Sequence, residues 1–371
     1  MARGTWNMTR IIYFSLDYTP HDHRFLSALA ETEHEVFYVR LQCGARQTED
    51  RSVPSKIEQI LWAGGQKPFE WKDLPRLMLD FRCLTRKIKP DLVHAGPIQT
   101  CGLLAALTGF RPLLTMSWGF DLMQDAGRNA WWRYVTHYTL ARSTFFISDC
   151  ETTRRKAIAY GMNPSRTIVF PWGVDLDHFV PAITRHSSPF TVFCNRAWEP
   201  RYGVDVLARA FVTAERQRPE LRLMLLGGGS QGTLLRQILT DGGVMERVHF
   251  GGQVSQNELP RYFWMADLFV SAAHVDGSSV SLMEALACGL PALVSDIPAN
   301  QEWVAEGVNG WLFPDGNIDA LSAAILRAYD ERMNLEEISR AARATAEEKA
   351  DWKKNFLKLL EAYDLALKVE S

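Results

Sequence analysis

The sequence predicts an α/β fold built from two doubly wound parallel sheets, and three observations support this. Short β-rich apolar runs alternate with longer segments of helical period. The alternation breaks once, at a stretch rich in Pro and Ser near 180–189, and then restarts. The length of 371 residues fits two domains. Strands that alternate with helices form parallel sheets with right-handed crossovers, so each half should be one doubly wound unit.

The first half contains short candidate strands rich in β-branched and aromatic residues, separated by segments with apolar residues three or four apart. Strands are predicted at 11–16, 35–39, 91–94, 113–116, 144–147 and 167–170. Helices are predicted at 22–31, 74–87, 101–108, 130–141 and 151–160.

The second half repeats this pattern. Strands are predicted at 191–194, 221–226, 248–250, 268–271 and 292–294, and helices at 204–216, 233–240, 257–263 and 282–288. A tail rich in Ala, Glu, Arg and Leu follows at 318–367 and should be helical. Within it, Trp352, Phe356 and Leu360 share one helical face, which has to dock its apolar stripe somewhere.

The composition indicates a globular protein, with 47% hydrophobic and 23% charged residues. No apolar run approaches the roughly 18 residues of a membrane span, and the run at 11–16 is too short for a signal-peptide core. The six cysteines show neither CxxC pairs nor ligand-like spacing, so neither a zinc site nor a disulfide framework is expected. We expect a cytoplasmic protein, alone or peripheral on the inner face of a membrane.

The charge is divided unevenly between the halves. Residues 1–189 hold 23 Lys and Arg against 18 Asp and Glu, a net charge of +5, whereas residues 190–371 have a net charge of −7. The basic half either faces an anionic partner, such as a phospholipid surface or a phosphorylated acceptor, or is ordinary solvated surface. We expect no nucleic-acid partner.

The stretch 274–300 carries the most chemistry. Strand 268–271 is followed by the loop Asp276-Gly277-Ser278-Ser279, which leads into the helix that carries Glu284. Gly277 lets a ligand approach the backbone, and hydroxyl and N–H donors at a helix start favour an anion such as a diphosphate. The two carboxylates can accept hydrogen bonds from the hydroxyls of two sugars. Alternatively, Asp276 and Ser279 only cap the helix.

Two other strand ends of the second half carry residues suited to phosphate. Arg196 and Arg201 follow strand 191–194, just before Gly203 opens a helix, and guanidinium groups bind phosphate through paired donors. The run 227–230 (GGGS) follows the next strand, where glycines are also common for packing reasons. It matches neither the dinucleotide-binding nor the Walker A motif.

Together these residues resemble the retaining nucleotide-sugar glycosyltransferases of family 4, which have the GT-B fold. The strongest match is the motif of two acids separated by seven residues, Asp276 and Glu284, followed by ALACGLP at 285–291. Further matches are VHFGGQ at 248–253, ADL at 266–268, GVNGWLF at 307–313, FPWGVD at 170–175 and SWGFD at 117–121. The resemblance covers most of the chain and is strongest over 144–311.

The resemblance implies three parts. Residues 1–183 would be an N-terminal acceptor-binding Rossmann-like domain, and residues 184–350 a C-terminal donor-binding domain, with a ligand cleft between them. Residues 351–371 would form a helix that packs back on the first domain. We therefore expect deletion of the residues after Ala350 to lower the melting temperature of both domains.

The resemblance also implies roles for single residues. Glu284 would hold the donor ribose, Asp276 the transferred sugar and Arg196 the diphosphate, while Asp121 would reach the sugar or the acceptor from the other domain. The predicted catalytic residues are thus Asp121, Arg196 and Asp276. The predicted donor site consists of Arg196, Arg201, Gly228, Gln253, Val254, Asp276, Gly277, Ser278, Ser279, Val280, Ser281 and Glu284.

Three positions of the chain depart from the family pattern. Asp276 stands where Glu is usual, and Trp118 stands where the family's H-G-x-D loop has its His. Tyr202 replaces the usual phosphate-binding Lys, so Arg201 is expected to substitute for it.

The family's Gly-Gly loop in the first half is replaced here by PHDHR at 20–24. Two interpretations remain open. Either His21, His23 or Arg24, with Trp118, lies on the acceptor side of the site and contacts phosphate or acceptor, or Asp22 simply caps the following helix.

The implied reaction moves a sugar from a UDP- or GDP-sugar to a hydroxyl of a glycan, lipid-linked or small-molecule acceptor, as in polysaccharide or glycoconjugate biosynthesis. It would retain the anomeric configuration and need neither a metal nor a cofactor, because the sequence offers no carboxylate cage for a divalent ion. The alternatives are a nucleotide-sugar 2-epimerase of the same fold and a non-catalytic sugar-nucleotide-binding protein.

Several tryptophans and arginines gather in the basic half, namely Trp71, Trp118, Trp131, Trp132, Arg128 and Arg133. The segment 131–133 (WWR) suits a membrane interface or a lipid-linked acceptor site. Burial in the core is the commoner fate of tryptophan and is the interpretation that we favour from the sequence.

Overall fold

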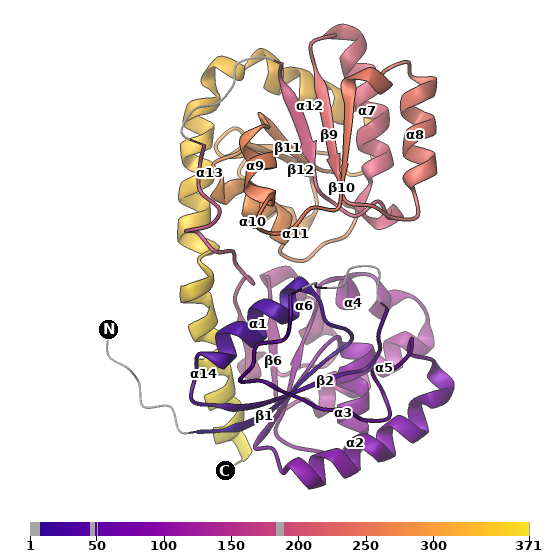
Figure 1. Ribbon diagram of the computed structural model, residues 1–371, viewed down its shortest axis with the longest axis vertical. Coiled ribbons are helices and arrows are strands. Elements are labelled where there is room, and N and C mark those ends of the chain that lie inside the picture. Colours follow the sequence, from indigo (N-terminus) through magenta and orange to yellow (C-terminus); the bar gives the residue numbers. More distant parts are fainter. Residues whose placement is uncertain (1–7, 45–48, 50, 183–188, 371) are drawn as a thin grey trace. The chain divides into compact units, whose positions relative to one another are not determined.

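The computed structural model describes residues 8–44, 49, 51–182 and 189–370. The chain divides into two compact units, each built on one sheet (Figure 1). Unit 1 comprises Met1–Phe170 together with Phe356–Ser371, and unit 2 comprises Pro171–Asn355. The expected break near 180–189 includes residues 183–188, which lie outside the described residues.

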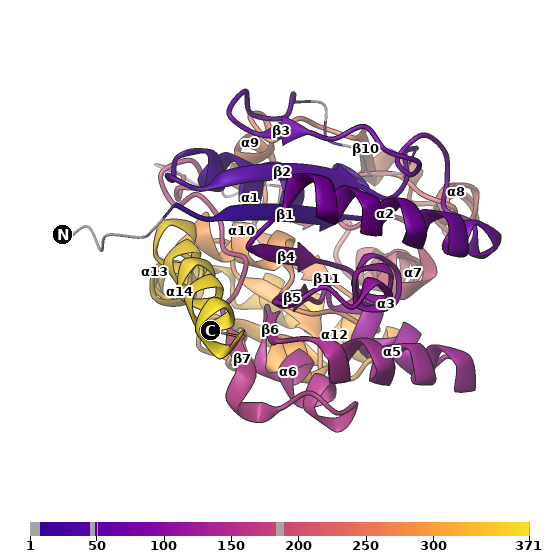
Figure 2. The same ribbon diagram turned by 90° about the horizontal axis from the view of Figure 1, so that it is seen from below.

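Unit 1 contains a parallel sheet with the strand order β3-β2-β1-β4-β5-β6-β7 (Figure 2). The strand order reverses direction between β1 and β4, which is the topological switch point of a doubly wound sheet. The strands are β1 (Arg10–Ser15), β2 (Glu35–Arg40), β3 (Glu58–Gln59), β4 (Leu92–Ala95), β5 (Leu113–Met116), β6 (Phe145–Ser148) and β7 (Thr167–Val169).

Helices cover both faces of this sheet, because side chains alternate along each buried strand. Ile12 and Phe14 of β1 pack with Phe81 on the face covered by α2 and α3, whereas Tyr13 points to the opposite face and contacts Phe25 of α1. The helices are α1 (Pro20–Ala30), α2 (Leu74–Ile88), α3 (Leu103–Thr108), α4 (Phe120–Met123), α5 (Ala130–Arg142) and α6 (Glu151–Ala159), with short helical turns η1 (Trp71–Asp73), η2 (Ile98–Gly102), η3 (Asp125–Gly127) and η4 (Pro164–Arg166).

Helix α14 (Trp352–Glu370) returns to unit 1, as the sequence predicts. Its Tyr363 is buried, and the phenol oxygen lies 2.8 Å from Nδ1 of His94 on β4. The buried side chains of this helix also include Leu359, Leu360 and Ala366. Of the predicted stripe, therefore, Leu360 docks deeply, whereas Trp352 and Phe356 are half-buried.

Unit 2 contains a second parallel sheet, with the strand order β10-β9-β8-β11-β12-β13. The strands are β8 (Thr191–Cys194), β9 (Arg222–Leu226), β10 (Val248–Gly252), β11 (Leu268–Ser271), β12 (Ala292–Ser295) and β13 (Gly310–Phe313). Both sheets are thus parallel with crossovers through helices, which confirms the predicted fold class.

Alternation along the strands of unit 2 produces two separate apolar cores. Val192 and Val270 join the core under α7, α8 and α12, whereas Phe193 and Phe269 join the core under α9, α10 and α13 (Figure 1). The helices are α7 (Val204–Gln217), α8 (Gly232–Asp241), α9 (Leu259–Trp264), α10 (Val280–Ala287), α11 (Pro298–Gln301), α12 (Ile318–Asp330) and α13 (Leu335–Lys349), with turns η5 (Pro200–Tyr202), η6 (Met245–Arg247) and η7 (Arg332–Asn334).

The predicted elements differ from the observed ones mainly in short pieces. Elements β3, β13, α4 and α11, each two to four residues long, are absent from the prediction. The predicted tail at 318–367 is three helices, α12 to α14, rather than one segment. Among the described residues, no helix is both long enough and apolar enough to cross a membrane.

The prediction of buried tryptophans is wrong for part of the aromatic group in unit 1. Trp71 is 38% exposed and Trp131 is 53% exposed, and Trp132 is half-buried. The reason lies in helix α5, which turns Val135, Thr136 and Leu140 to the core and therefore leaves Trp131 and Tyr134 on the solvent side.

Candidate functional site

The carboxyl ends of three strands of unit 2 carry the arginine, the glycine run and the aspartate that the sequence singles out. Arg196 follows β8, the glycine run 227–229 follows β9, and Asp276 follows β11. The strands β9, β8 and β11 are neighbours in the sheet, and all run parallel. Their carboxyl ends therefore meet at one edge, which is where open α/β sheets bind ligands.

Arg196 is the centre of this group. Its guanidinium donates from Nη2 to Oδ2 of Asp276 and from Nη1 to Oγ of Ser279, each over 2.6 Å. The guanidinium carbon also lies 4.3 Å from the ring centroid of Tyr202, within the range of a cation–π contact. Arg196 is only 8% exposed, so its positive charge is held in place and largely shielded from water.

The buried pair changes the proton affinity of both partners. Burial raises the pKa of Asp276 above its ordinary value, although the Arg196 charge and the Gly277 N–H oppose that rise. Burial alone would lower the pKa of Arg196. The nearby Asp276 and other groups that favour the charged form outweigh this effect, so the net pKa of Arg196 is raised and the guanidinium stays charged. Nε of Arg196 is buried and has no hydrogen-bond partner among the described residues.

Gly203 explains how the turn after β8 reaches the site. Its φ is +56°, in the left-handed region, and a Cβ at this position would lie 2.0 Å from the carbonyl oxygen of Ala272. Only glycine therefore lets the start of α7 pass so close to the end of β11. This close approach holds Tyr202 beside the strand end, where its ring lies on Arg196.

The loop before α10 both caps its helix and contacts Arg196. Ser279 caps the helix by accepting from the Leu282 N–H, and it also accepts from Arg196. Ser278 accepts a hydrogen bond from the indole N–H of Trp303 over 3.1 Å. Asp276 does not cap the helix but holds Arg196 and the Gly277 N–H. The alternative that both residues only cap the helix is therefore wrong.

Glu284 lies one turn further along α10 and is 2% exposed. Its carboxylate contributes to raising the pKa of Arg196, so the two charges are close enough to interact. Val280 and Ser281, at the start of the same helix, are half-buried. The predicted residues 276–281 and Glu284 thus lie on one continuous segment, the loop before α10 and the first turns of that helix.

The glycine run after β9 is fixed from both sides. The Gly227 N–H donates to the Gly252 carbonyl over 2.6 Å, and Glu199 accepts from both the N–H and the hydroxyl of Ser230. A Cβ on Gly228 would meet nothing within 4 Å, so this backbone borders open space. Of the remaining predicted donor residues, Gln253 is exposed just after β10, and Val254 and Arg201 are half-buried.

In unit 1, Asp121 is fully buried at the start of α4. Its carboxylate accepts from the Ile98, Trp118 and Leu122 N–H groups over 3.0 to 3.1 Å and from the Ser117 hydroxyl. Burial raises the pKa of Asp121 to about 6, against the effect of these hydrogen bonds. The carboxylate thus organises its own loop, and its role toward a sugar or an acceptor stays a prediction.

The segment 20–24 forms the first turns of α1. Asp22 completes a capping box with Thr19 and also accepts from the Tyr13 phenol over 3.1 Å, so the capping interpretation is confirmed. His23 lies 2.7 Å from the Tyr18 phenol oxygen, and the ring centroids of His21 and Trp118 are 5.4 Å apart. His21, Trp118 and Arg24 are half-buried, and their role on the acceptor side stays a prediction.

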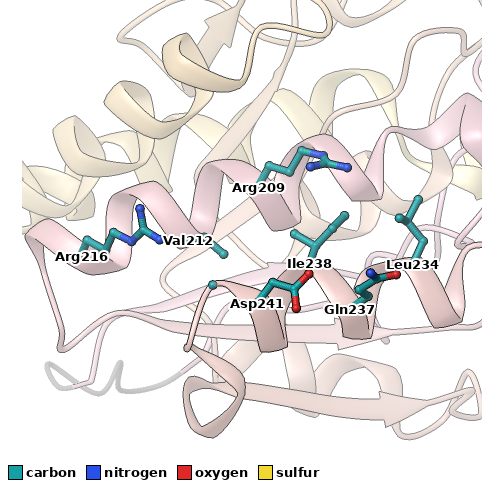
Figure 3. Close-up of a pocket in the computed structure, with 8 residues that line it drawn as sticks. Arg209, Val212, Arg216, Leu234, Gln237, Ile238 and Asp241 are labelled. Carbon is teal, nitrogen blue, oxygen red and sulfur yellow. The ribbon is translucent and has the colours of Figure 1, made fainter.

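A cavity of about 440 Å³ lies elsewhere on unit 2, between α7 and α8 (Figure 3). Arg209 and Arg216 line it from α7, and Leu234, Gln237 and Asp241 line it from α8. None of the predicted donor residues lines this cavity, so the site at the strand ends is separate from it. Among the described residues, no group of three or more His, Cys, Asp or Glu side chains is arranged to hold a metal ion.

Sequence reasoning missed three supporting residues, namely Tyr202 as the ring under Arg196, Trp303 as the donor to Ser278, and Glu199 as the clamp on the glycine run. Of the three, only Glu199 could have been suspected from the sequence, because it follows Arg196 by three residues after the same strand. Trp303 comes from a distant segment, and no spacing in the sequence connects it with the site.

Comparison with known proteins covers both units. Residues 21–178 match the family model described as Glycosyltransferase Family 4, and residues 179–345 match the model described as Glycosyl transferases group 1. Sucrose-phosphate synthase from Thermosynechococcus elongatus superposes with a TM-score of 0.81 at 18% identity, covering 96% of this chain and 98% of that chain. Anabaena HepE in complex with UDP-glucose gives 0.77 at 18% identity, covering 96% and 99%.

Two curated relatives are similar in sequence. The GDP-mannose-dependent alpha-(1-6)-phosphatidylinositol monomannoside mannosyltransferase of Mycolicibacterium smegmatis is 30% identical over 62% of this chain. The UDP-Gal:alpha-D-GlcNAc-diphosphoundecaprenol alpha-1,3-galactosyltransferase of Escherichia coli is 25% identical, covering 71% of this chain and 72% of the relative. The chain spans 64% of the length of the mycobacterial relative. With both family models matched in consecutive segments, from residue 21 to residue 345, and with the fold of solved glycosyltransferases, the chain belongs to glycosyltransferase family 4 and has the GT-B fold.

Proposed function

We propose that the protein transfers a sugar from a nucleotide diphosphate sugar to a hydroxyl group of a glycan or lipid-linked acceptor. The observation that carries this proposal is the buried guanidinium of Arg196, held between Asp276, Ser279 and Tyr202 at the carboxyl ends of parallel strands. A fixed cation at this place suits a diphosphate, and the nearby carboxylates of Asp276 and Glu284 suit sugar hydroxyls. The relatives named above are described as transferases, and none of them is described as an epimerase.

Charge development explains why such a site favours transfer. As the bond between the sugar and the phosphate lengthens, the sugar becomes oxocarbenium-like and negative charge grows on the departing phosphate oxygen. Arg196, already oriented by its partners, and the N–H groups at the start of α10 stabilise that charge without reorganising. Glu284 accepts from the ribose hydroxyls, and Asp276 from a hydroxyl of the transferred sugar.

The proposal includes retention of the anomeric configuration. In front-side transfer the acceptor attacks from the side of the leaving group, and the departing phosphate oxygen takes the acceptor proton. No protein base is then required, which is consistent with Trp118 at the position where the family usually has His. A guanidinium that carries the phosphate charge also removes the need for a divalent ion, so we propose metal-independent catalysis.

We further propose UDP- or GDP-sugars as donors and reaction in the cytoplasm. The uridine and guanosine classes both occur in the names of the relatives. All six cysteines are free thiols, four of them buried, which is usual in a reducing compartment.

Nucleotide release from a panel of UDP-, GDP- and ADP-sugars tests the proposal, with and without glycan and lipid-linked acceptors. We expect release from one donor, faster with an acceptor and reduced at least about hundredfold in Glu284→Ala. NMR of the product should show the donor's anomeric configuration, and addition of EDTA should leave the rate unchanged.

The matched control is Glu258→Ala, which removes an exposed carboxylate near β10 and should release nucleotide at the wild-type rate. Thermal stabilisation by a nucleotide without turnover of any donor would instead favour a binding protein. An inverted product would contradict front-side transfer, and loss of activity on chelation would contradict metal independence.

A further inference from the structure

Unit 1 carries an exposed cluster of aromatic rings that the reaction proposed above does not use. We call it the aromatic surface, and it consists of Phe69, Trp71, Trp131, Trp132 and Tyr134. Trp131 and Tyr134 are 53% and 57% exposed and Trp71 is 38% exposed, whereas indole and phenol rings of folded proteins are usually well covered. Two segments 60 residues apart in the chain contribute to it, η1 and α5.

The rings of the aromatic surface are packed against one another before any partner arrives. Trp71 lies edge-on to both Trp131 and Trp132, with centroid distances of 6.3 and 5.9 Å, and also contacts Phe69 at 5.3 Å. Trp131 stacks on Tyr134 at 6.1 Å. Contacts of this kind fix ring orientation, so little conformational entropy is lost when the surface meets a partner.

The charges around these rings are positive on the α5 side. Helix α5 contains Arg133 and Arg142 and no Asp or Glu. The Arg128 guanidinium lies 5.6 Å from the ring of Trp132, and that of Arg142 lies 3.6 Å from the ring of Tyr138.

On the η1 side the charges cancel. Lys72 pairs with Glu70, and Lys67 pairs with Asp73 over 2.7 Å. The aromatic surface therefore combines rings with an excess of arginines, within a half of the chain whose net charge is +5.

This combination matches the boundary between water and an anionic lipid bilayer. Indole and phenol rings have an apolar body and a polar tip and gather at that boundary, and guanidinium groups bind lipid phosphates through paired donors. An acidic protein partner would also attract the arginines. It would not, however, require the three large rings of Trp71, Trp131 and Tyr134 to be exposed together on η1 and α5. We propose that the aromatic surface docks unit 1 on anionic phospholipid.

Vesicle flotation tests the proposal without donor or acceptor, so its outcome is independent of the proposed reaction. Wild-type protein is mixed with vesicles of phosphatidylcholine alone or with about 30 mol % phosphatidylglycerol, in NaCl from about 50 to 500 mM. We expect binding to the anionic vesicles at least roughly tenfold stronger than to the neutral ones, weakening as salt rises. Indole fluorescence should shift to shorter wavelength and be quenched by brominated lipid.

Two variants separate the rings from the charges. Trp131→Ser/Tyr134→Ser should lower vesicle binding at least roughly tenfold and reduce the quenching of indole fluorescence by brominated lipid. Arg128→Gln/Arg133→Gln should remove most of the preference for anionic over neutral vesicles. Leu61→Ser is the matched control, because Leu61 is 87% exposed in the same unit but lies outside the aromatic surface. Its binding should stay within about twofold of wild type.

All three variants should keep the wild-type melting temperature, because every substituted side chain is exposed. Wild-type protein that fails to float with anionic vesicles would overturn the proposal. So would a ring variant that floats as well as wild type, or binding to an acidic protein that the ring variant loses while its vesicle binding persists.

Discussion

Both units bury a carboxylate beside the carboxyl end of a central strand, but they neutralise it in different ways. In unit 1, Asp121 accepts hydrogen bonds from three backbone N–H groups and a serine hydroxyl, all from nearby loops. In unit 2, Asp276 faces the guanidinium of Arg196, which comes from a strand end 80 residues earlier in the chain. The first arrangement fixes a loop, whereas the second holds a charge in position.

This difference shows why burial alone is a poor guide to function. Burial raises the pKa of both Asp121 and Asp276. Only Asp276 is paired with a charged side chain that still has donor capacity, because the guanidinium has five N–H donors and Nε is unused among the described residues. A carboxylate that shares a cation is therefore a stronger candidate for a binding site than one whose oxygens are already saturated by neighbouring N–H and hydroxyl groups.

Breaking the charged pair should have the largest effect. We expect Arg196→Met to lower kcat/KM for donor turnover by at least about a hundredfold, because the growing phosphate charge loses its fixed cation. Steady-state nucleotide release measures this loss. Arg209→Met is the control, since Arg209 is an exposed arginine of the same unit beside the cavity of Figure 3. Equal losses in both variants would contradict a specific role for Arg196.

A smaller effect should come from the ring under Arg196. Tyr202→Leu removes the cation–π contact and should lower kcat roughly three- to tenfold, whereas Tyr202→Phe keeps the ring and should stay near wild type. Paired measurements of kcat and KM distinguish positioning of the guanidinium from simple loss of donor binding. If Phe were as harmful as Leu, the hydroxyl rather than the ring would be the important group.

The buried carboxylate of Asp121 should make the free energy of unfolding depend on pH. The pKa of Asp121 is about 6 in the folded protein, against about 4 in an unfolded chain. Between these values the folded state binds more protons than the unfolded state, so the free energy of unfolding falls as pH rises from about 4 to about 6. For one fully buried group this loss is at most about 3 kcal/mol.

Urea unfolding of wild type and Asp121→Asn at pH 4.5 and pH 7 measures this effect, and the variant should lose less stability over that interval. Asp22→Asn is the comparison within unit 1, because burial raises the pKa of Asp22 to about 6 as well. If instead Asp121→Asn abolishes sugar transfer and leaves stability and its pH dependence unchanged, the predicted contact of Asp121 with sugar or acceptor is favoured.

Most of the fold was predictable because the alternation of short apolar strands with helical segments is strong in both halves. Strands β8 and β11 were predicted to the residue. Strands β3 and β13 were not, since a two-residue edge strand has no period and β13 begins in a glycine-rich loop. Periodicity also fails for α5, which has large apolar side chains on both its core and solvent sides and so does not reveal the face that is buried.

The charged members of the site were predictable because acids and arginines directly after strands have few structural roles. Their orientation was not predictable. That the ring of Tyr202 lies on Arg196 depends on the path that Gly203 imposes past Ala272, and contact between distant backbones leaves no local pattern.

The discontinuity of unit 1 has a consequence for the order of events during synthesis. The segment that completes unit 1 begins at Phe356, so all of unit 2 is translated between the two parts of unit 1. At typical translation rates this takes roughly 10 to 40 seconds, during which Tyr363 is not yet available to His94 on β4. Unit 2 is continuous and can complete its fold first, so we expect the N-terminal half to be more accessible to chaperones and proteases while unit 2 is translated.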